Sequence, residues 1–131
     1  FLEAAEVYGD YYGTPRRQVE QALREGKDVL LEIDTEGARQ VRAIYPDGVF
    51  IFIAPPSLQE LRNRILKRGT EPEEVMERRL MLAKSELERM REYDYVVVNN
   101  EVHQAVATIK AIITAEKCRS RRVAFLLSSS L

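Results

Sequence analysis

The sequence predicts an α/β domain with a parallel sheet that is covered by helices on both faces. Three apolar segments, residues 28–34, 49–54 and 93–98, have the length and the β-branched content of buried strands. Segments with helical spacing of apolar residues and with capping signals lie between and after them. Apolar strands that alternate with helices are typical of parallel sheets, because the crossover helices cover the sheet.

A short module rich in tyrosine and glycine precedes this alternation. Residues 7–14 read Val-Tyr-Gly-Asp-Tyr-Tyr-Gly-Thr, which predicts two extended pieces joined by a turn at Gly9-Asp10. Thr14 and Pro15 then predict the N-cap and the first position of a helix that stops at Gly26.

Capping signals place the remaining helices. Residues 36–43 have helical spacing, and Ser57 and Thr70 each have a glutamate three positions later, which is the capping-box pattern for two helices that end near residues 69 and 91. Asn99-Asn100 can cap a last helix that reaches residue 117. The tail, residues 118–131, leaves two alternatives. Its apolar part is either a short buried strand that completes the sheet, in its own chain or in a neighbour's, or a helical or frayed end.

The overall composition limits the possible classes of function. Hydrophobic residues make up 45% of the 131 residues and charged residues 31%, which is enough for one buried core. Twenty basic and twenty-one acidic residues give a net charge of −1, so no basic field indicates nucleic acid or an anionic membrane as a partner. No apolar run approaches the roughly 20 residues that span a bilayer.

Single residues add three expectations. Cys118 is the one cysteine, so no intramolecular disulfide can form, which fits a reducing cytoplasm. His103 is the one histidine, so a histidine-based metal site is not expected. The chain starts at Phe1 without methionine and without the pattern of a signal peptide, which indicates a fragment of a longer protein.

Two groups of charged residues are candidates for chemistry. Glu32 and Asp34 would share one face at the carboxyl end of a strand, where α/β proteins bind ligands, and two carboxylates there suit magnesium-linked phosphate chemistry. They could equally just begin a loop. Arg64, Arg68 and Arg79 could form bidentate contacts with phosphate oxygens, or they could belong to a solvated face together with their charged neighbours.

Taken together, the sequence resembles guanylate kinase over residues 1 to about 117. No single motif decides this; the order and spacing of seven do. These motifs are Glu3, Tyr11-Tyr12-Gly13-Thr14-Pro15, Leu31-Glu32-Ile33-Asp34-x-x-Gly37, Phe52-Ile53-Ala54-Pro55-Pro56-Ser57, Arg68-Gly69-Thr70-Glu71, Arg79-Leu80 and Tyr95-Val96-Val97-Val98-Asn99.

The resemblance implies the fold of the P-loop nucleoside monophosphate kinases, and phosphoryl transfer from ATP to GMP with Mg²⁺. Residues 1–14 would then be part of a small GMP-binding β module. The core α/β domain would comprise residues 15–67 and 92–117. Residues 68–91 would form the lid and the helix after it, and the tail, residues 118–131, has no assigned role.

The resemblance also assigns roles to single residues. GMP would be bound by Glu3 at the guanine ring, Tyr12 at the phosphate, Thr14 at the guanine edge, and Asp34 with Glu32 on the magnesium side. The transferring phosphoryl group would lie between Arg68 and Arg79, with Arg64 assisting. ATP would contact Arg68, Asn99 and Asn100, and Mg²⁺ would come bound to ATP without a complete protein site in this chain.

The chain departs from the family pattern in three places. The family often has tryptophan where this chain has Ala4 and glutamine where it has Glu36. More important, the sequence holds no Gly-x-x-x-x-Gly-Lys-Ser/Thr motif: its one Gly-Lys pair, Gly26-Lys27, is followed by Asp28. The expected N-terminal strand and P-loop are therefore missing, and the chain alone is expected to be inactive. The alternative function is a non-catalytic guanylate-kinase-like interaction module. A homo-oligomer or a strand swap through the empty sheet position also stays open.

Overall fold

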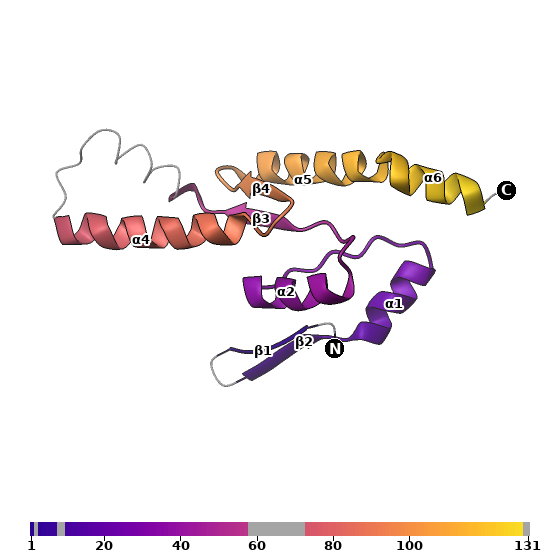
Figure 1. The fold of residues 1–131 in the computed structure, drawn as a ribbon, viewed down its shortest axis with the longest axis horizontal. Helices are drawn as coiled ribbons and strands as arrows, with labels where there is room; N and C mark the ends of the chain where they lie inside the picture. Colours follow the sequence, from indigo (N-terminus) through magenta and orange to yellow (C-terminus); the bar gives the residue numbers. More distant parts are fainter. Residues whose placement is uncertain (2, 8–9, 58–72, 130–131) are drawn as a thin grey trace. The chain divides into compact units, whose positions relative to one another are not determined.

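The computed structural model describes residues 1, 3–7, 10–57 and 73–129, with the backbone alone for residues 3–7 and 10–12. The chain forms two compact units, Phe1–Gly48 and Val49–Leu131. Figure 1 labels their helices and strands.

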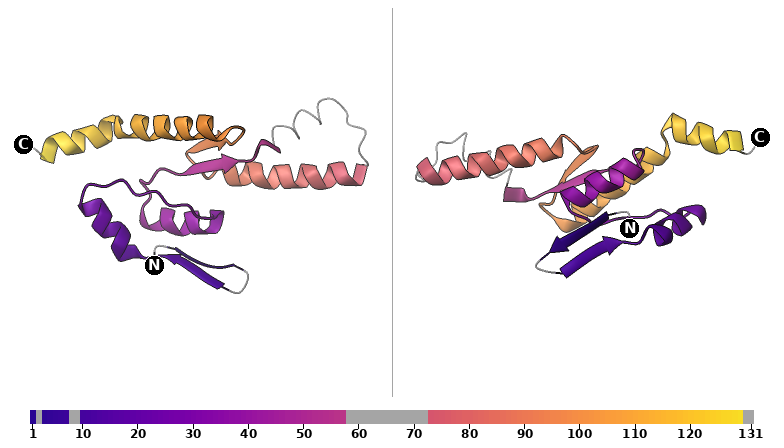
Figure 2. Two further views of the ribbon diagram at one scale, coloured as in Figure 1. Left: turned by 180° about the vertical axis from the view of Figure 1, so that it is seen from behind. Right: turned by 60° about the horizontal axis from the view of Figure 1, so that its bottom comes forward.

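The first unit begins with an antiparallel hairpin of β1 (Glu3–Val7) and β2 (Asp10–Thr14), drawn in indigo in Figure 2. The two extended pieces predicted for this module are therefore confirmed. Asp10 was expected in the turn, but it is the first residue of β2 and pairs with Val7. Residues 8–9, between the strands, lie outside the described residues.

Helix α1 (Arg16–Arg24) follows the hairpin. The prediction that Thr14 is its N-cap is wrong: Thr14 pairs with Glu3 in the hairpin, and Pro15 occupies the cap position without a side-chain hydrogen bond. The predicted stop at Gly26 is confirmed. Its φ of +77° suits glycine, and the Gly26 and Lys27 N–H groups donate to the Leu23 and Ala22 carbonyls, 3.0 Å each, in a Schellman motif.

Helix α2 (Thr35–Ile44) matches the helix predicted over 36–43 and lies beside β1. It buries Gly37, Ala38 and Val41, positions that fall on one face of a helix. Asp34 is its N-cap.

The strand predicted over residues 28–34 is wrong. These residues are not in a strand, and Leu30, expected to be buried, is 76% exposed. The apolar pattern alone does not make a strand, because an extended segment needs a partner for its N–H and C=O groups. The described strands pair only as β1 with β2 and β3 with β4.

The second unit contains a parallel pair, β3 (Ile51–Ala54) and β4 (Tyr95–Val98), which bears out the predicted α/β fold class. Each strand begins two residues later than predicted, after a clamp formed by Phe50 and Asp94. The Phe50 N–H donates to Asp94 Oδ2 (2.8 Å), and the Asp94 N–H donates to the Phe50 carbonyl (2.8 Å). This clamp fixes the register, in which Ile51 lies opposite Tyr95.

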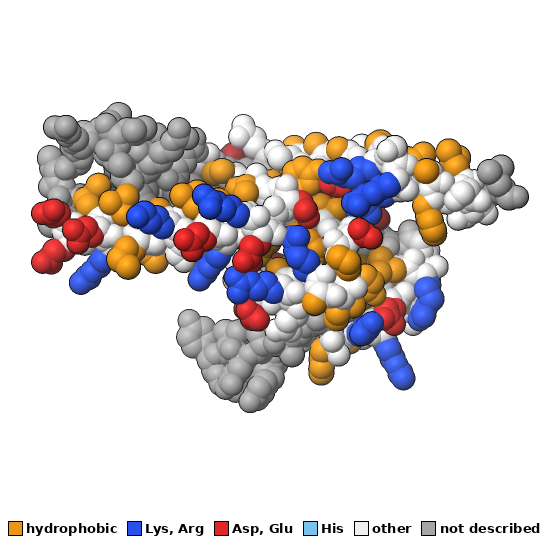
Figure 3. Space-filling view, in the orientation of Figure 1, with side chains coloured by type: hydrophobic (Ala, Val, Ile, Leu, Met, Phe, Trp, Pro, Cys, Tyr) orange, Lys and Arg blue, Asp and Glu red, His pale blue; other side chains and the backbone are white. Residues whose placement is uncertain are grey.

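Helix α4 (Glu73–Met90) belongs to the connection between these two strands and confirms the described part of the helix predicted over 70–91. Residues 56–57 are helical, and the rest of the helix expected up to residue 69 lies outside the described residues, as does Thr70. Figure 3 shows hydrophobic side chains exposed along α4 among acidic and basic ones. Those more than half exposed are Met81, Leu82 and Leu87.

Helix α5 (Val102–Lys117) packs against β4 and ends where predicted (Figure 1). Its cap is not Asn99-Asn100 but Glu101, whose carboxylate accepts the N–H groups of His103 (3.0 Å) and Gln104 (2.9 Å). Among the residues of this unit that the structure describes, the buried hydrophobic ones are Phe50, Phe52, Ala54, Val97 and Ala105.

The tail forms helix α6 (Ser120–Ser129), which confirms the helical alternative and contradicts the inserted or swapped strand over residues 122–128. A helix satisfies its hydrogen bonds within the segment, whereas a strand needs a partner. The Val123 N–H accordingly donates to the Arg119 carbonyl (3.1 Å). No helix among the described residues is long and apolar enough to cross a membrane.

Candidate functional site

The hairpin register brings three predicted GMP-binding positions together. Glu3 lies opposite Thr14, and Tyr12 lies opposite Ala5. Opposite positions share a face of a hairpin, as do positions two apart on one strand. Glu3, Tyr12 and Thr14 therefore occupy one face of the β1–β2 ladder. Thr14 is half-buried, and for the other two the structure gives the backbone position.

The predicted acidic pair lies in the same unit, at the entrance to α2. Glu32 and Asp34 are both exposed. Asp34 Oδ1 accepts the Gly37 N–H at 2.7 Å, which satisfies one of the unpaired donors of the first helical turn. Asp34 thus has a structural role as a helix cap. Helix α2, which Asp34 caps, lies beside β1 in the same unit.

Arg79 is less exposed to solvent than its neighbour Arg78. Five of the six half-buried positions of α4, residues 76, 79, 83, 86 and 90, recur every three to four residues and therefore form one stripe along the helix. Arg79 is in this stripe, whereas Arg78 is exposed. The solvated-face interpretation therefore fits Arg78 better than Arg79. Arg64 and Arg68 lie outside the described residues.

Asn99 and Asn100 follow the carboxyl end of β4. The Asn99 N–H donates to the Ala54 carbonyl (2.9 Å), so the β3–β4 ladder continues to this residue. Both asparagines are exposed, just ahead of α5. The carboxyl ends of parallel strands are where open α/β sheets bind ligands, so this loop lies at a position where a ligand could bind.

No cluster of three or more His, Cys, Asp or Glu side chains that could hold a metal ion occurs within the described ranges. Magnesium that is bound to nucleotide phosphates does not require one, because one or two protein carboxylates are enough. The exposed carboxylates of Glu32 and Asp34 fit that donor set.

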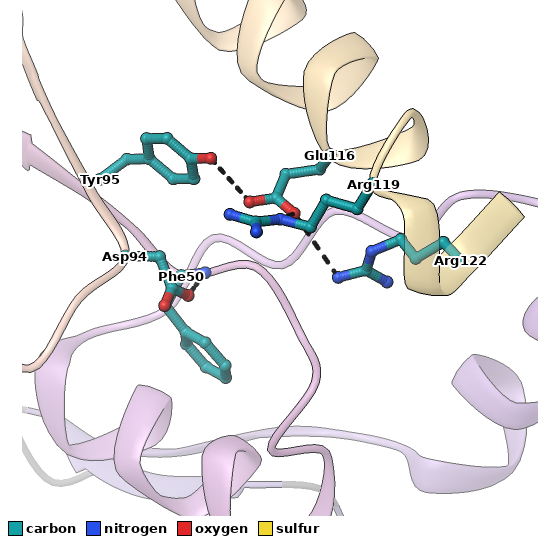
Figure 4. Close-up of polar contacts among 6 residues, drawn as sticks. All are labelled: Phe50, Asp94, Tyr95, Glu116, Arg119 and Arg122. Carbon is teal, nitrogen blue, oxygen red and sulfur yellow. Dashed lines mark hydrogen bonds and ion pairs between the residues drawn. The ribbon is translucent and has the colours of Figure 1, made fainter. Parts of the chain in front are cut away.

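Sequence reasoning missed a polar cluster around Glu116, near the C-terminus of α5 (Figure 4). Glu116 is 6% exposed and accepts hydrogen bonds from the Tyr95 hydroxyl (2.7 Å) and from Arg119 Nε (2.5 Å). Arg122 Nη2 lies 3.7 Å from Oε2 of the same carboxylate. The hydrogen bonds from Arg119 and Tyr95 lower the pKa of the Glu116 carboxyl below its ordinary value.

One signal in the sequence could have revealed this cluster. Glu116 follows Ile109, Ile112 and Ile113 by seven, four and three positions, so it falls on the partly buried stripe of α5. A glutamate in such a stripe requires partners, because an isolated buried charge is costly.

Comparison with known proteins links the chain to one family. The guanylate kinase family model matches residues 1–116. The guanylate kinases of Bacillus anthracis and Bacillus subtilis are 58% and 56% identical to it, each over 123 residues and 94% of the chain. The crystal structure of guanylate kinase from Anaplasma phagocytophilum matches with a TM-score of 0.67 and 35% identity, over 97% of this chain and 63% of that one.

The chain spans about 60% of the length of the two Bacillus relatives. The family model nevertheless covers both units, from the hairpin to Glu116 at the end of α5. The chain belongs to the guanylate kinase family.

Proposed function

We propose that this chain carries the GMP-binding and catalytic groups of a guanylate kinase, which transfers a phosphoryl group from ATP to GMP and gives ADP and GDP. The observation that carries this proposal is the hairpin register, in which Glu3, Tyr12 and Thr14 occupy one face. Family membership supports it, because the relatives matched over 94% of this chain are guanylate kinases.

In this proposal the hairpin, within the GMP-binding module of residues 1–14, selects the base. The Glu3 carboxylate accepts hydrogen bonds from the ring N–H and the exocyclic amine of guanine, and Thr14 contacts the guanine edge. Adenine has no N–H at the corresponding ring position, so Glu3 would discriminate against AMP. The Tyr12 hydroxyl donates a hydrogen bond to the GMP phosphate.

Arginines act on the transferring phosphoryl group. Phosphoryl transfer depends on positioning and on neutralising charge in the transition state, and a guanidinium provides both. Arg68 and Arg79 have this role, and Arg64 assists from the lid. The half-buried position of Arg79 supports this role, because its side chain is less fully solvated than that of an exposed arginine such as Arg78.

The ATP side comprises Arg68 and the loop of Asn99 and Asn100, near the adenosine. Glu32 and Asp34 lie on the magnesium side. The Mg²⁺ ion bound with ATP would neutralise phosphate charge. We place the reaction in the cytoplasm, in keeping with a chain that holds a single cysteine.

The alternative is a guanylate-kinase-like interaction module without catalysis. Such modules tend to lose the guanine ligands and the lid arginines. This sequence retains the candidate ligands and lid arginines Glu3, Tyr12, Asp34, Arg68 and Arg79, which favours the enzyme.

A chimera tests the proposal. In it, the part of the Bacillus subtilis relative that this chain does not span, which the resemblance implies contains the P-loop, precedes residue 1. A coupled assay with ATP, Mg²⁺ and GMP should show turnover for the chimera. The 131-residue chain alone should show none, because it holds no P-loop motif to position the phosphates. A chimera that folds, as judged by circular dichroism, but phosphorylates no nucleotide would support the interaction module instead.

A further inference from the structure

Glu116 connects three elements of the second unit. It lies in the last turn of α5, its Oε1 accepts the hydroxyl of Tyr95 at the start of β4, and its Oε2 accepts Arg119 Nε at the α5–α6 junction. Arg122, in the first turn of α6, points its guanidinium toward the same carboxylate (Figure 4). One buried carboxylate therefore faces β4 on one side and the beginning of α6 on the other.

Helix α6 is short and largely exposed to solvent. It has ten residues and none of them is buried. Helices shorter than about 12–15 residues are marginal in water on their own, and most helix stability in proteins comes from packing an apolar face. Phe125, Leu126 and Leu127 are each more than 60% exposed, so the apolar residues of α6 provide little such packing.

We propose that Glu116 holds α6 against β4 and α5. Loss of its negative charge would release α6 while β4 and α5 stay folded. The charged groups that face Glu116 are Arg119 and Arg122, and the Tyr95 hydroxyl faces it from β4. A neutral glutamine has one acceptor oxygen. Its NH₂ group is a donor and cannot accept a hydrogen bond from the groups that the second carboxylate oxygen binds. Strand β4 and helix α5 also pack through apolar side chains, because Val97 and Ala105 are both buried.

Hydrogen exchange measured by mass spectrometry on the full 131-residue chain tests this proposal. Glu116→Gln should raise the exchange rate of the α6 amides by roughly tenfold to a hundredfold, the range expected when a hydrogen bond to a charged group is lost. Exchange of the α5 amides that follow Ala105 should stay unchanged. Tyr95→Phe and Arg119→Gln should act in the same direction with smaller effects. These two variants carry the test if Glu116→Gln does not fold.

A double variant and a control sharpen the result. Because Glu116 and Arg119 would act through one contact, the double variant Glu116→Gln/Arg119→Gln should exchange no faster than Glu116→Gln alone. Glu77→Gln removes the same charge from an exposed position of α4 and should leave α6 unchanged. Unchanged α6 exchange in all the Glu116, Tyr95 and Arg119 variants, or a rise that α5 shares equally, would overturn the proposal.

Discussion

Glu3 and Thr14 are opposite each other in the β1–β2 hairpin, at the first residue of one strand and the last of the other. This pairing places the two residues proposed to contact guanine on one rung of a ladder, with Tyr12 two positions before Thr14 on the same face. The hairpin register alone therefore brings these three positions together.

Glu3→Gln in the chimera should raise the KM for GMP by about tenfold or more and leave the KM for ATP nearly unchanged. The glutamine amide can accept one guanine donor but opposes the other, and an unpaired buried donor costs about 1–3 kcal/mol. The matched control is Glu6→Gln, at an alternate position of the same strand and hence on the other face. Steady-state kinetics in which GMP and ATP are varied in turn measure the two KM values. If both KM values rise together, Glu3 does not recognise the base.

Arg79→Met in the chimera should lower kcat by about 10³-fold, the lower end of the effect of an arginine finger, with little change in the KM for GMP. Arg78→Met is the matched control, because its side chain is exposed beside the stripe that holds Arg79. Equal kcat values for the two variants would assign Arg79 to the solvated face.

Two substitutions separate the structural role of Asp34 from its proposed ligand role. Asp34→Ala removes the acceptor of the Gly37 N–H and should lower the free energy of unfolding by about 1 kcal/mol. Asp34→Asn keeps an acceptor at the cap and should retain that stability. In the chimera, Asp34→Asn should still lower activity, because the charge toward Mg²⁺ is lost. Urea denaturation checks the first point, and the second is contradicted if Asp34→Asn has full activity.

The stability of the chain should fall in acid partly because of Glu116. Its pKa is lower in the folded protein than in the unfolded chain, so protonation favours unfolding. The contribution of Glu116 should be complete above the ordinary glutamate pKa, about 4.3, and should be lost as the pH falls through the lowered folded value. Glu116→Gln should lack this part of the pH dependence. Denaturation midpoints between neutral pH and about pH 3 measure it, and parallel curves for the two proteins would contradict it.

Features that depend on neighbouring residues could be predicted from the sequence. The stop of α1 at Gly26 follows from a glycine that can adopt positive φ, and α2 follows from helical spacing. The parallel pair of β3 and β4 follows from two apolar segments with helical sequence between them.

Features that depend on distant partners could not be predicted in this way. Residues 28–34 have the pattern of a buried strand, but whether they form one is decided by a pairing segment elsewhere. The Glu116 cluster depends on Tyr95, 21 positions earlier, and only the fold brings the two together. The hairpin register that aligns Glu3 with Thr14 likewise depends on where the two strands pair. Asp10 pairs with Val7, although it was expected to lie in the turn.

The most direct test of the account is the ratio of kcat/KM for GMP to kcat/KM for AMP in the chimera. A site built to hydrogen-bond a substrate N–H rejects the analogue that lacks it by about 10⁴-fold or more. We therefore predict a preference for GMP of that order, which Glu3→Gln reduces. A folded chimera that phosphorylates AMP as efficiently as GMP would contradict the proposal that this chain carries the guanine-binding site of a guanylate kinase.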